Sequence, residues 1–160
     1  YNEFVFQFLT RHDNAYLTEL HQLFMQKVIR PQMRPQGFAA IEHHKALGHE
    51  IVGITATSDF ITAPIFREFG ITNIIATNAE VVEGAYTGKV AGLPCYQQGK
   101  LLRLDQWLDG RQVNESWAYS DSINDRFLLE YATHAIAVNP DDRLETLAQE
   151  KGWEVQDWSI

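Results

Sequence analysis

The feature that most constrains this chain is an alternation of short apolar runs with amphipathic segments, which begins at Pro35 and continues to the C-terminus. Apolar runs at 50–55, 73–77, 116–120 and 135–138 have the length of buried strands, and segments with helical periodicity separate them. Strands separated by helices predict right-handed crossovers and a mainly parallel sheet with helices on both faces. We therefore predict a Rossmann-like α/β fold, in which ligands bind at the carboxyl ends of the strands.

Residues 1–33 follow a different pattern, which is helical throughout. An amphipathic segment begins the chain, and a second helix follows that either Asp13 or Asn14 can cap. Two prolines within 30–35 then end this region, because prolines so close together stop a helix and favour an extended connector. We therefore predict a helical segment over 1–33 and an α/β domain over 34–160.

The composition excludes several classes of protein. With 160 residues, of which 45% are hydrophobic, the chain can bury the core of one compact domain. A net charge of -8 argues against non-specific nucleic-acid binding and against anionic membranes, but it permits a small anionic substrate at a locally positive site. Cys95 is the sole cysteine, so no intrachain disulfide is possible. Since no signal peptide or membrane span is visible, we expect a cytoplasmic protein.

A pair of aspartates gives the strongest local signal. Asp121 follows directly after the apolar run 116–120, and Asp125 lies four residues later, in the first turn of the next predicted helix. That spacing can direct both carboxylates to one point above the strand end, where their oxygens would suit Mg²⁺. Alternatively, both residues only cap the helix and interact favourably with its dipole. The pair by itself leaves both interpretations open.

Two further candidates are Thr55 and Lys100. Thr55 ends the apolar run 50–55, and small hydroxyl residues follow it before the next helix. A hydroxyl and backbone N–H groups at a helix start suit a phosphate, although an ordinary capped turn shows the same pattern. Lys100 opens a helix predicted over 101–108, where its charge opposes the helix dipole unless an anion lies nearby. The alternative for Lys100 is an ordinary surface lysine.

Taken in order, these signals resemble the later motifs of the haloacid dehalogenase superfamily. The match is closest to the branch that contains phosphoserine phosphatase (subfamily IB). The segments that carry the resemblance are 51–65 (IVGITATSDFITAPI), 88–100 (GKVAGLPCYQQGK), 119–125 (YSDSIND) and 135–141 (AIAVNPD). The resemblance covers the chain from Pro35 onward, and it implies that 1–33 is the remnant of a helical cap inserted after the first core strand.

The resemblance implies that four residues handle the phosphoryl group. Thr55 would donate a hydrogen bond to it, and Ala56 and Asn124 would help to bind it. Lys100 would offset its negative charge and that of the nucleophile. The substrate implied is a small phosphorylated metabolite.

The resemblance also implies a magnesium site at the aspartate pair. Asp121 would ligate Mg²⁺, and Asp125 would support the metal directly or through water. Tyr119 and Ser120 stand where glycine is more usual before the metal-binding aspartate, a departure that leaves the ligand itself in place.

The first motif of the superfamily is absent from this sequence. That motif is an apolar strand ending in Asp-x-Asp, whose first Asp attacks phosphorus and whose second acts as general acid and base. None of the nine aspartates has this context. The chain begins with Tyr1 instead of Met, so we expect the missing strand to lie upstream in the natural protein. We accordingly predict a phosphomonoester hydrolase whose 160-residue form is inactive alone.

Three alternatives stay open at this point. The chain could be a non-catalytic module that keeps a phosphate and metal pocket. It could also be a phosphotransferase that passes the phosphoryl group to an alcohol, which the sequence does not separate from a hydrolase. A nucleotide-binding domain of another family is less well supported, because no Gly-rich phosphate loop follows any predicted strand.

Overall fold

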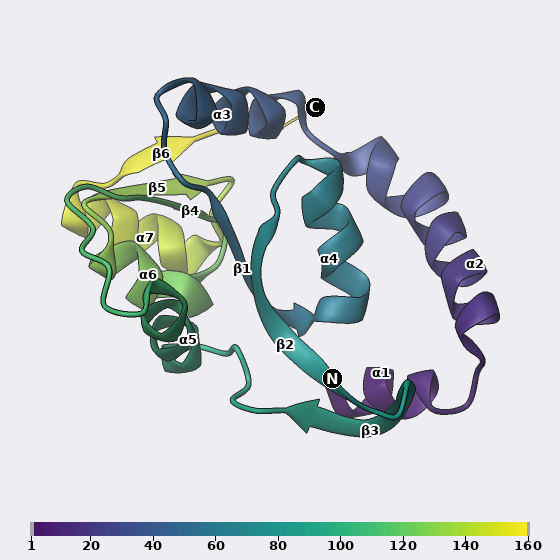
Figure 1. Cartoon of the computed structure of the whole chain (residues 1–160). Coiled ribbons are helices and arrows are strands. Elements are labelled where there is room, and N and C mark those ends of the chain that lie inside the picture. Colours follow the sequence, from purple (N-terminus) through teal and green to yellow (C-terminus); the bar gives the residue numbers. More distant parts are fainter. Residues whose placement is uncertain (1, 160) are drawn as a thin grey trace. The chain divides into compact units, whose positions relative to one another are not determined.

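The structure is a computed structural model that describes residues 2–159 (Figure 1). The chain divides into two compact units, residues 1–96 and residues 97–160. Both units combine strands with helices, which confirms the α/β class predicted from the alternating pattern. Among the residues described, none of the helices has the length and apolar character needed to span a membrane.

The first unit is helical up to residue 46 and then contains three strands and a further helix. Its elements in chain order are α1 (Asn2–Leu9), α2 (Asn14–Phe24), the π-helix η1 (Met25–Ile29), the 3-10 helix η2 (Arg30–Gln32), α3 (Pro35–Ala46), β1 (Val52–Ser58), α4 (Asp59–Glu68), β2 (Asn73–Val82) and β3 (Ala85–Ala91). Asp13 caps α2, since its carboxylate accepts a hydrogen bond of 2.8 Å from the backbone N–H of Tyr16.

The connector predicted over 30–35 is shorter than expected. The backbone continues from α2 as one π-helical segment, η1, and one 3-10 turn, η2. Only Met33 and Arg34 are extended, with ψ values of 122° and 131°. Arg34 is extended because it precedes Pro35, whose ring disfavours the helical region for the residue before it. Pro35 itself opens α3, where its missing N–H does no harm.

The sheet of the first unit has the order β1-β2-β3. β1 and β2 run parallel, and β2 and β3 form an antiparallel hairpin. Glu83 and Gly84 make the turn with φ values of 50° and 81°, the left-handed geometry that a two-residue hairpin turn favours and that glycine adopts without strain. Figure 1 shows α4 beside β1 and β2. Gly53 permits this approach, because a Cβ there would lie 2.6 Å from the ring of Phe66.

The ladder between β1 and β2 is irregular at the point where the predicted phosphate turn begins. Ile54 pairs with Ile75, and the next pair is Ser58 with Thr77. β1 therefore advances four residues while β2 advances two, and residues 55–57 bulge out of the ladder. Thr55 was predicted to end the strand; the strand continues to Ser58, but its regular pairing stops before Thr55.

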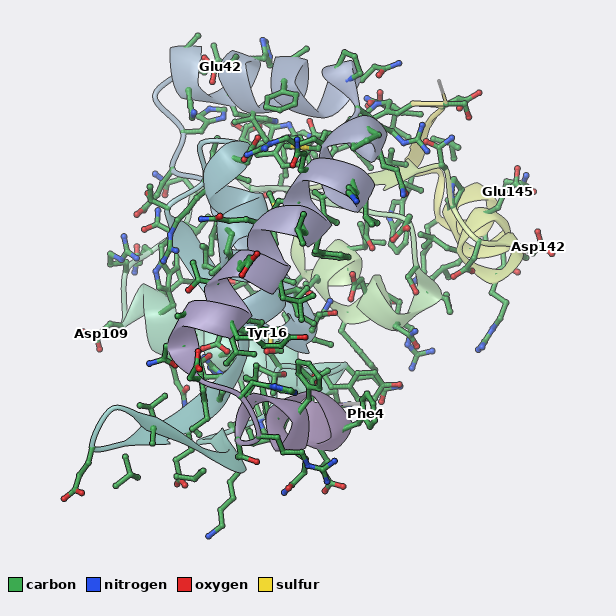
Figure 2. All side chains as sticks on the ribbon, turned by 90° about the vertical axis from the view of Figure 1, so that its right-hand side faces the viewer. Phe4, Tyr16, Glu42, Asp109, Asp142 and Glu145 are labelled. Carbon is green, nitrogen blue, oxygen red and sulfur yellow. The ribbon has the colours of Figure 1, made fainter. Side chains whose placement is uncertain are left out.

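The apolar core of the first unit forms where the N-terminal helices meet the hairpin. Phe6 and Leu9 of α1 and Leu17 of α2 are almost fully buried and pack with Tyr86 and Val90 of β3, among others. These α1 residues recur at helical spacing, which places them on one face. Figure 1 shows α1 alongside β3. Phe4, on another face of α1, is 78% exposed and projects outward in Figure 2.

The second unit consists of a helix followed by two consecutive strand–helix–strand crossovers. Its elements are α5 (Gln98–Leu108), β4 (Trp117–Ser120), the 3-10 helix η3 (Ile123–Asp125), α6 (Arg126–Tyr131), β5 (His134–Val138), α7 (Asp142–Lys151) and β6 (Glu154–Gln156). The three strands are parallel in the order β4-β5-β6. Right-handed crossovers that step in one direction put their helices on the same face of the sheet.

Packing in the second unit confirms that α6 and α7 share one face. Ala135 and Ala137 of β5 point to this face and contact Leu129 of α6 as well as Leu144 and Ala148 of α7. All five residues are buried. The small alanine side chains allow both helices to pack close to the strand.

The fold differs in part from the predicted sheet. The described residues form two three-stranded sheets, and the antiparallel pair β2–β3 makes one of them mixed instead of parallel. The predicted single sheet with helices on both faces therefore stays a prediction. The same holds for the division into a cap remnant over 1–33 and a core over 34–160, since both ranges contribute to the first unit.

Candidate functional site

A buried ion pair lies at the start of α5. The Lys100 ammonium pairs with the Asp125 carboxylate, and Lys100 is only 6% exposed. A lysine in the first turn of a helix opposes the helix dipole, and burial removes most of its hydration. The nearby carboxylate offsets both effects. Lys100 is therefore not the surface lysine of the alternative interpretation, because it is buried and bound to one of the two predicted aspartates.

Asp125 is held on both of its carboxylate oxygens. Oδ1 accepts from Lys100, and Oδ2 accepts a hydrogen bond of 2.8 Å from the hydroxyl of Ser120 at the end of β4. Ser120 Oγ in turn accepts from the backbone N–H of Ser122 at 3.2 Å. Asp125 thus fixes the position of Lys100, and its carboxylate is committed to protein partners.

Asp121 differs from Asp125 in its surroundings. It is the first residue after β4 and is exposed. Its carboxylate makes no hydrogen bond or ion pair with any residue between 2 and 159. A free carboxylate at a strand end is the donor that Mg²⁺ prefers, so this residue fits the predicted role of metal ligand. Within the same range, no three His, Cys, Asp or Glu side chains lie close enough together to form a metal site.

The turn between Asp121 and Asp125 is built from local hydrogen bonds. Ser122 caps η3, because its hydroxyl accepts from the backbone N–H of Asn124 at 3.3 Å. Asn124 itself is exposed, so its side-chain amide is accessible from solvent. This geometry agrees in part with the capping alternative: Ser122 caps η3 through its side chain, and Asp125 occupies the N-cap position of α6 without a side-chain capping bond.

Asp141 is a residue of this region that we did not predict to have a role. Its backbone N–H donates to the carbonyl of Asp121 at 2.9 Å, and its Oδ2 accepts from the backbone N–H of Ile123 at 2.9 Å. Its Oδ1 caps α7 by accepting from Leu144 at 2.8 Å. The hydrogen bonds from Ile123 and Leu144 lower the pKa of the Asp141 carboxyl below its ordinary value. The sequence signal that could have identified Asp141 is its position between an apolar strand and the following helix.

The other predicted phosphate turn lies in the first unit, at the bulge of β1. Thr55 Oγ1 accepts from the backbone N–H of Thr57 at 3.1 Å, and Asn2 Nδ2 donates to the Ala56 carbonyl at 3.1 Å. Ser58 caps α4 by accepting from Phe60 N at 3.2 Å and is fully buried. The hydroxyl of Thr55 keeps its proton available for an acceptor, because the bond to Thr57 uses only its oxygen.

The structure thus brings Lys100 and Asp125 into contact and places Asp121 and Asn124 on the same turn. Thr55 and Ala56 belong to the first unit. The convergence of Thr55 with the other residues stays a prediction.

A cavity of about 850 Å³ in the first unit contains none of the predicted site residues. It lies between α2 and α4, and His21, Asp59, Phe60 and Tyr86 contribute to its lining. Arg30 also lines it, but its guanidinium binds the Glu68 carboxylate through two hydrogen bonds of 2.6 and 3.2 Å.

Comparison with protein families gives one match that spans most of the chain. The family described as haloacid dehalogenase-like hydrolase matches residues 1–130. This range includes both polar turns and the buried ion pair.

Comparison with individual proteins points the same way. A histidinol-phosphatase of Neisseria meningitidis is 40% identical over 92% of this chain, and a phosphoserine phosphatase of Mycobacterium tuberculosis is 39% identical over 73% of it. The chain spans 69% of the length of the first and 39% of the second. A crystal structure of a protein of unknown function from Bordetella pertussis Tohama I is 41% identical, with a TM-score of 0.93, over 99% of this chain and 73% of that one.

Proposed function

The chain belongs to the haloacid dehalogenase-like hydrolase family, and from this premise we propose that it serves a magnesium-dependent phosphomonoester hydrolase reaction. The observation that carries the proposal is the buried Lys100–Asp125 pair on the same turn as the free carboxylate of Asp121. A fixed positive charge and an open metal-ligand carboxylate suit transfer of a phosphoryl group, since negative charge develops on its oxygens.

Each residue has a proposed task in binding. Lys100 offsets the charge of the phosphoryl oxygens, and Asp125 holds the ammonium in place. Thr55 donates its hydroxyl proton to a phosphoryl oxygen, and Ala56 and Asn124 contribute further polar groups. The Thr55 hydroxyl is suited to this task because its oxygen already accepts from Thr57.

Asp121 is the residue that we propose to hold Mg²⁺. When bound, the metal would supply Lewis-acid stabilisation of phosphoryl oxygens. Asp125 supports the site through Lys100 and Ser120, since both of its oxygens already have protein partners. Asp121 would bind the metal with water and substrate oxygens in the other positions, as magnesium sites commonly do.

The reaction also needs a carboxylate nucleophile and a general acid. No aspartate of the 160 residues stands in an Asp-x-Asp sequence. We therefore expect the 160-residue chain to bind phosphate and Mg²⁺ without hydrolysing a phosphate ester.

The test is release of phosphate from a generic aryl phosphate in the presence of Mg²⁺. It is run with the 160-residue chain and with the protein expressed from its complete coding sequence. The expected result is turnover by the second alone, lost in Asp121→Asn and retained in Asp142→Asn, an exposed aspartate on α7 (Figure 2). Turnover by the 160-residue chain that Asp121→Asn abolishes would contradict the expectation that these 160 residues lack the nucleophile. Turnover that survives Asp121→Asn would contradict the metal site.

A non-catalytic module that binds phosphate and metal is the second candidate. The Lys100–Asp125 pair and the open Asp121 carboxylate would serve binding alone as well as catalysis. It predicts that phosphate and Mg²⁺ bind to the protein from the complete coding sequence but that no ester is hydrolysed. A phosphotransferase gives a third outcome of the same assay, namely phosphorylated alcohol when an alcohol acceptor is added.

We propose a small phosphorylated metabolite as the substrate. The support comes from the relatives, whose names specify histidinol phosphate and phosphoserine chemistry. A panel of phosphorylated amino acids and amino alcohols, compared by kcat/KM, separates these classes.

A further inference from the structure

We propose that Asp141 is a positioning residue that fixes the turn bearing Asp121, and so presents the Asp121 carboxylate to the metal. This inference rests on the proposed function, because it concerns the same magnesium site. Asp141 comes from the loop after β5, whereas Asp121 comes from the loop after β4. The two loops lie next to each other because β4 and β5 are paired in parallel.

Asp141 contacts the Asp121 turn at two points. Its backbone N–H donates to the carbonyl of Asp121, and its Oδ2 accepts from the N–H of Ile123, each at 2.9 Å. The two bonds bracket Ser122 and thus fix the backbone on both sides of the bend. The Asp121 side chain itself has no partner within residues 2–159, so the backbone alone fixes the point from which its carboxylate extends.

The second carboxylate oxygen anchors Asp141 to a rigid element. Oδ1 accepts from Leu144 N in the first turn of α7, and Leu144 is fully buried against β5. The Asp121 turn is therefore connected through one side chain to the packed core of the second unit. Groups that orient a metal ligand in this way contribute substantially to metal affinity.

A helix cap alone does not require this arrangement. Capping α7 uses one oxygen, and serine or threonine would serve as well as aspartate. The bond to Ile123 needs a second acceptor that points in another direction, which a carboxylate provides and a hydroxyl already used as a cap does not. Asp142, the next residue, has no bond to the turn through its side chain and projects outward in Figure 2.

The substitution Asp141→Ser separates the two tasks. Serine keeps the cap on Leu144 but cannot also reach Ile123, so the stability of α7 is largely retained while the tether is lost. Asp142→Ser is the matched control, since it removes the same charge from the same helix turn. Asp121→Asn reports the loss of the ligand itself.

The measurement is an NMR titration of the 160-residue chain with Mn²⁺, followed by line broadening of backbone amides. We expect broadening centred on Asp121 in the wild type, about tenfold weaker apparent affinity in Asp141→Ser, and wild-type affinity in Asp142→Ser. Thermal unfolding of both serine variants should stay close to that of the wild type. Amide exchange of Ile123 should speed up several-fold in Asp141→Ser alone.

The outcomes separate this inference from the proposed function. Equal Mn²⁺ affinity in Asp141→Ser and wild type, with a wild type that binds, overturns the positioning role and leaves the metal site intact. A wild type without broadening near Asp121 overturns the metal site and with it the role of Asp141. Unchanged exchange of Ile123 in Asp141→Ser overturns the tether whatever the metal does.

Discussion

The two polar turns of the molecule are stabilised in different ways. The bulge near the end of β1, in the first unit, combines two contacts of its own hydroxyls, in which Thr55 accepts from Thr57 and Ser58 from Phe60, with one distant contact from Asn2 to the Ala56 carbonyl. The turn after β4, in the second unit, depends on distant partners. Lys100 reaches Asp125 across 25 positions of sequence, and Asp141 reaches Ile123 across 18.

This difference shows which contacts each turn depends on. The hydroxyl contacts of Thr55 and Ser58 are short-range, although the bulge itself depends on the register between β1 and β2. The side-chain contacts that hold the Asp121–Asp125 turn come from α5 and from the loop between β5 and α7. We therefore expect the second turn to be the more sensitive to substitution, and the following predictions test that expectation.

The largest effect is expected at the buried ion pair. Lys100→Ala leaves the Asp125 carboxylate mostly buried without its cation, and should destabilise the second unit by about 3 kcal/mol. Chemical denaturation followed by tryptophan fluorescence measures this loss, since all four tryptophans lie in the second unit. Lys45→Ala, which removes an exposed pair with Glu42, is the control and should change stability by less than about 0.5 kcal/mol. Equal effects of the two substitutions would show that the Lys100 pair is not structurally important.

The next effect is expected at Ser120. Ser120→Ala removes both the donor to Asp125 and the acceptor for Ser122, and should lower the free energy of unfolding by about 2 kcal/mol. Ser120→Thr keeps the hydroxyl and should recover most of the loss. Denaturant midpoints of the three proteins give the comparison, and an alanine variant as stable as the wild type would refute the proposed network.

A smaller effect is expected in the first unit. Thr55→Val removes one acceptor from a half-buried turn and should cost about 1 kcal/mol or less of stability. It should nevertheless weaken binding of inorganic phosphate, because the hydroxyl donor is lost. Calorimetric titration with phosphate, alongside Thr10→Val as an exposed control, tests this combination. A large loss of stability with unchanged phosphate binding would contradict the expectation that the second turn is the more sensitive to substitution.

The smallest expected effect is on the pH dependence of stability, which should differ between the two units. Burial, with the nearby charges of His49 and His43, lowers the pKa of His44 in the first unit. A lowered histidine pKa means that the unfolded state takes up the proton first, so stability falls as the pH drops below the ordinary value of about 6.5. His44→Gln should flatten this slope between pH 7 and pH 5 in thermal unfolding of the first unit. An unchanged slope would contradict the prediction.

Asp141 in the second unit responds at lower pH. Its lowered pKa contributes stability that is present above the ordinary carboxyl value and is lost as the pH falls through the folded value. The second unit should therefore keep the stability that Asp141 contributes at pH 5. At the same pH, protonation of His44 in the unfolded state has already lowered the stability of the first unit.

The sequence predicted the residues whose role depends on their position along one element. Asp121 could be placed at a strand end and Lys100 at a helix start, because periodicity is local.

The sequence did not predict the features that arise from pairing across the fold. The bulge at 55–57 depends on the register between β1 and β2, and the tether from Asp141 depends on β4 lying beside β5. The sequence left open whether Asp125 supports the metal directly or indirectly. Contacts with Lys100 and Ser120 make Asp125 a support and leave Asp121 open.

Our central proposal is that the polar residues of both turns act on one phosphate, with Asp121 supplying the metal ligand. An NMR titration of the 160-residue chain with inorganic phosphate, with and without Mg²⁺, tests it most directly. We predict that the amides of Thr55, Ala56, Lys100 and Asn124 shift together with one affinity, and that Mg²⁺ tightens this affinity only while Asp121 is intact. Separate affinities at the two turns, or shifts confined to one of them, would contradict the claim.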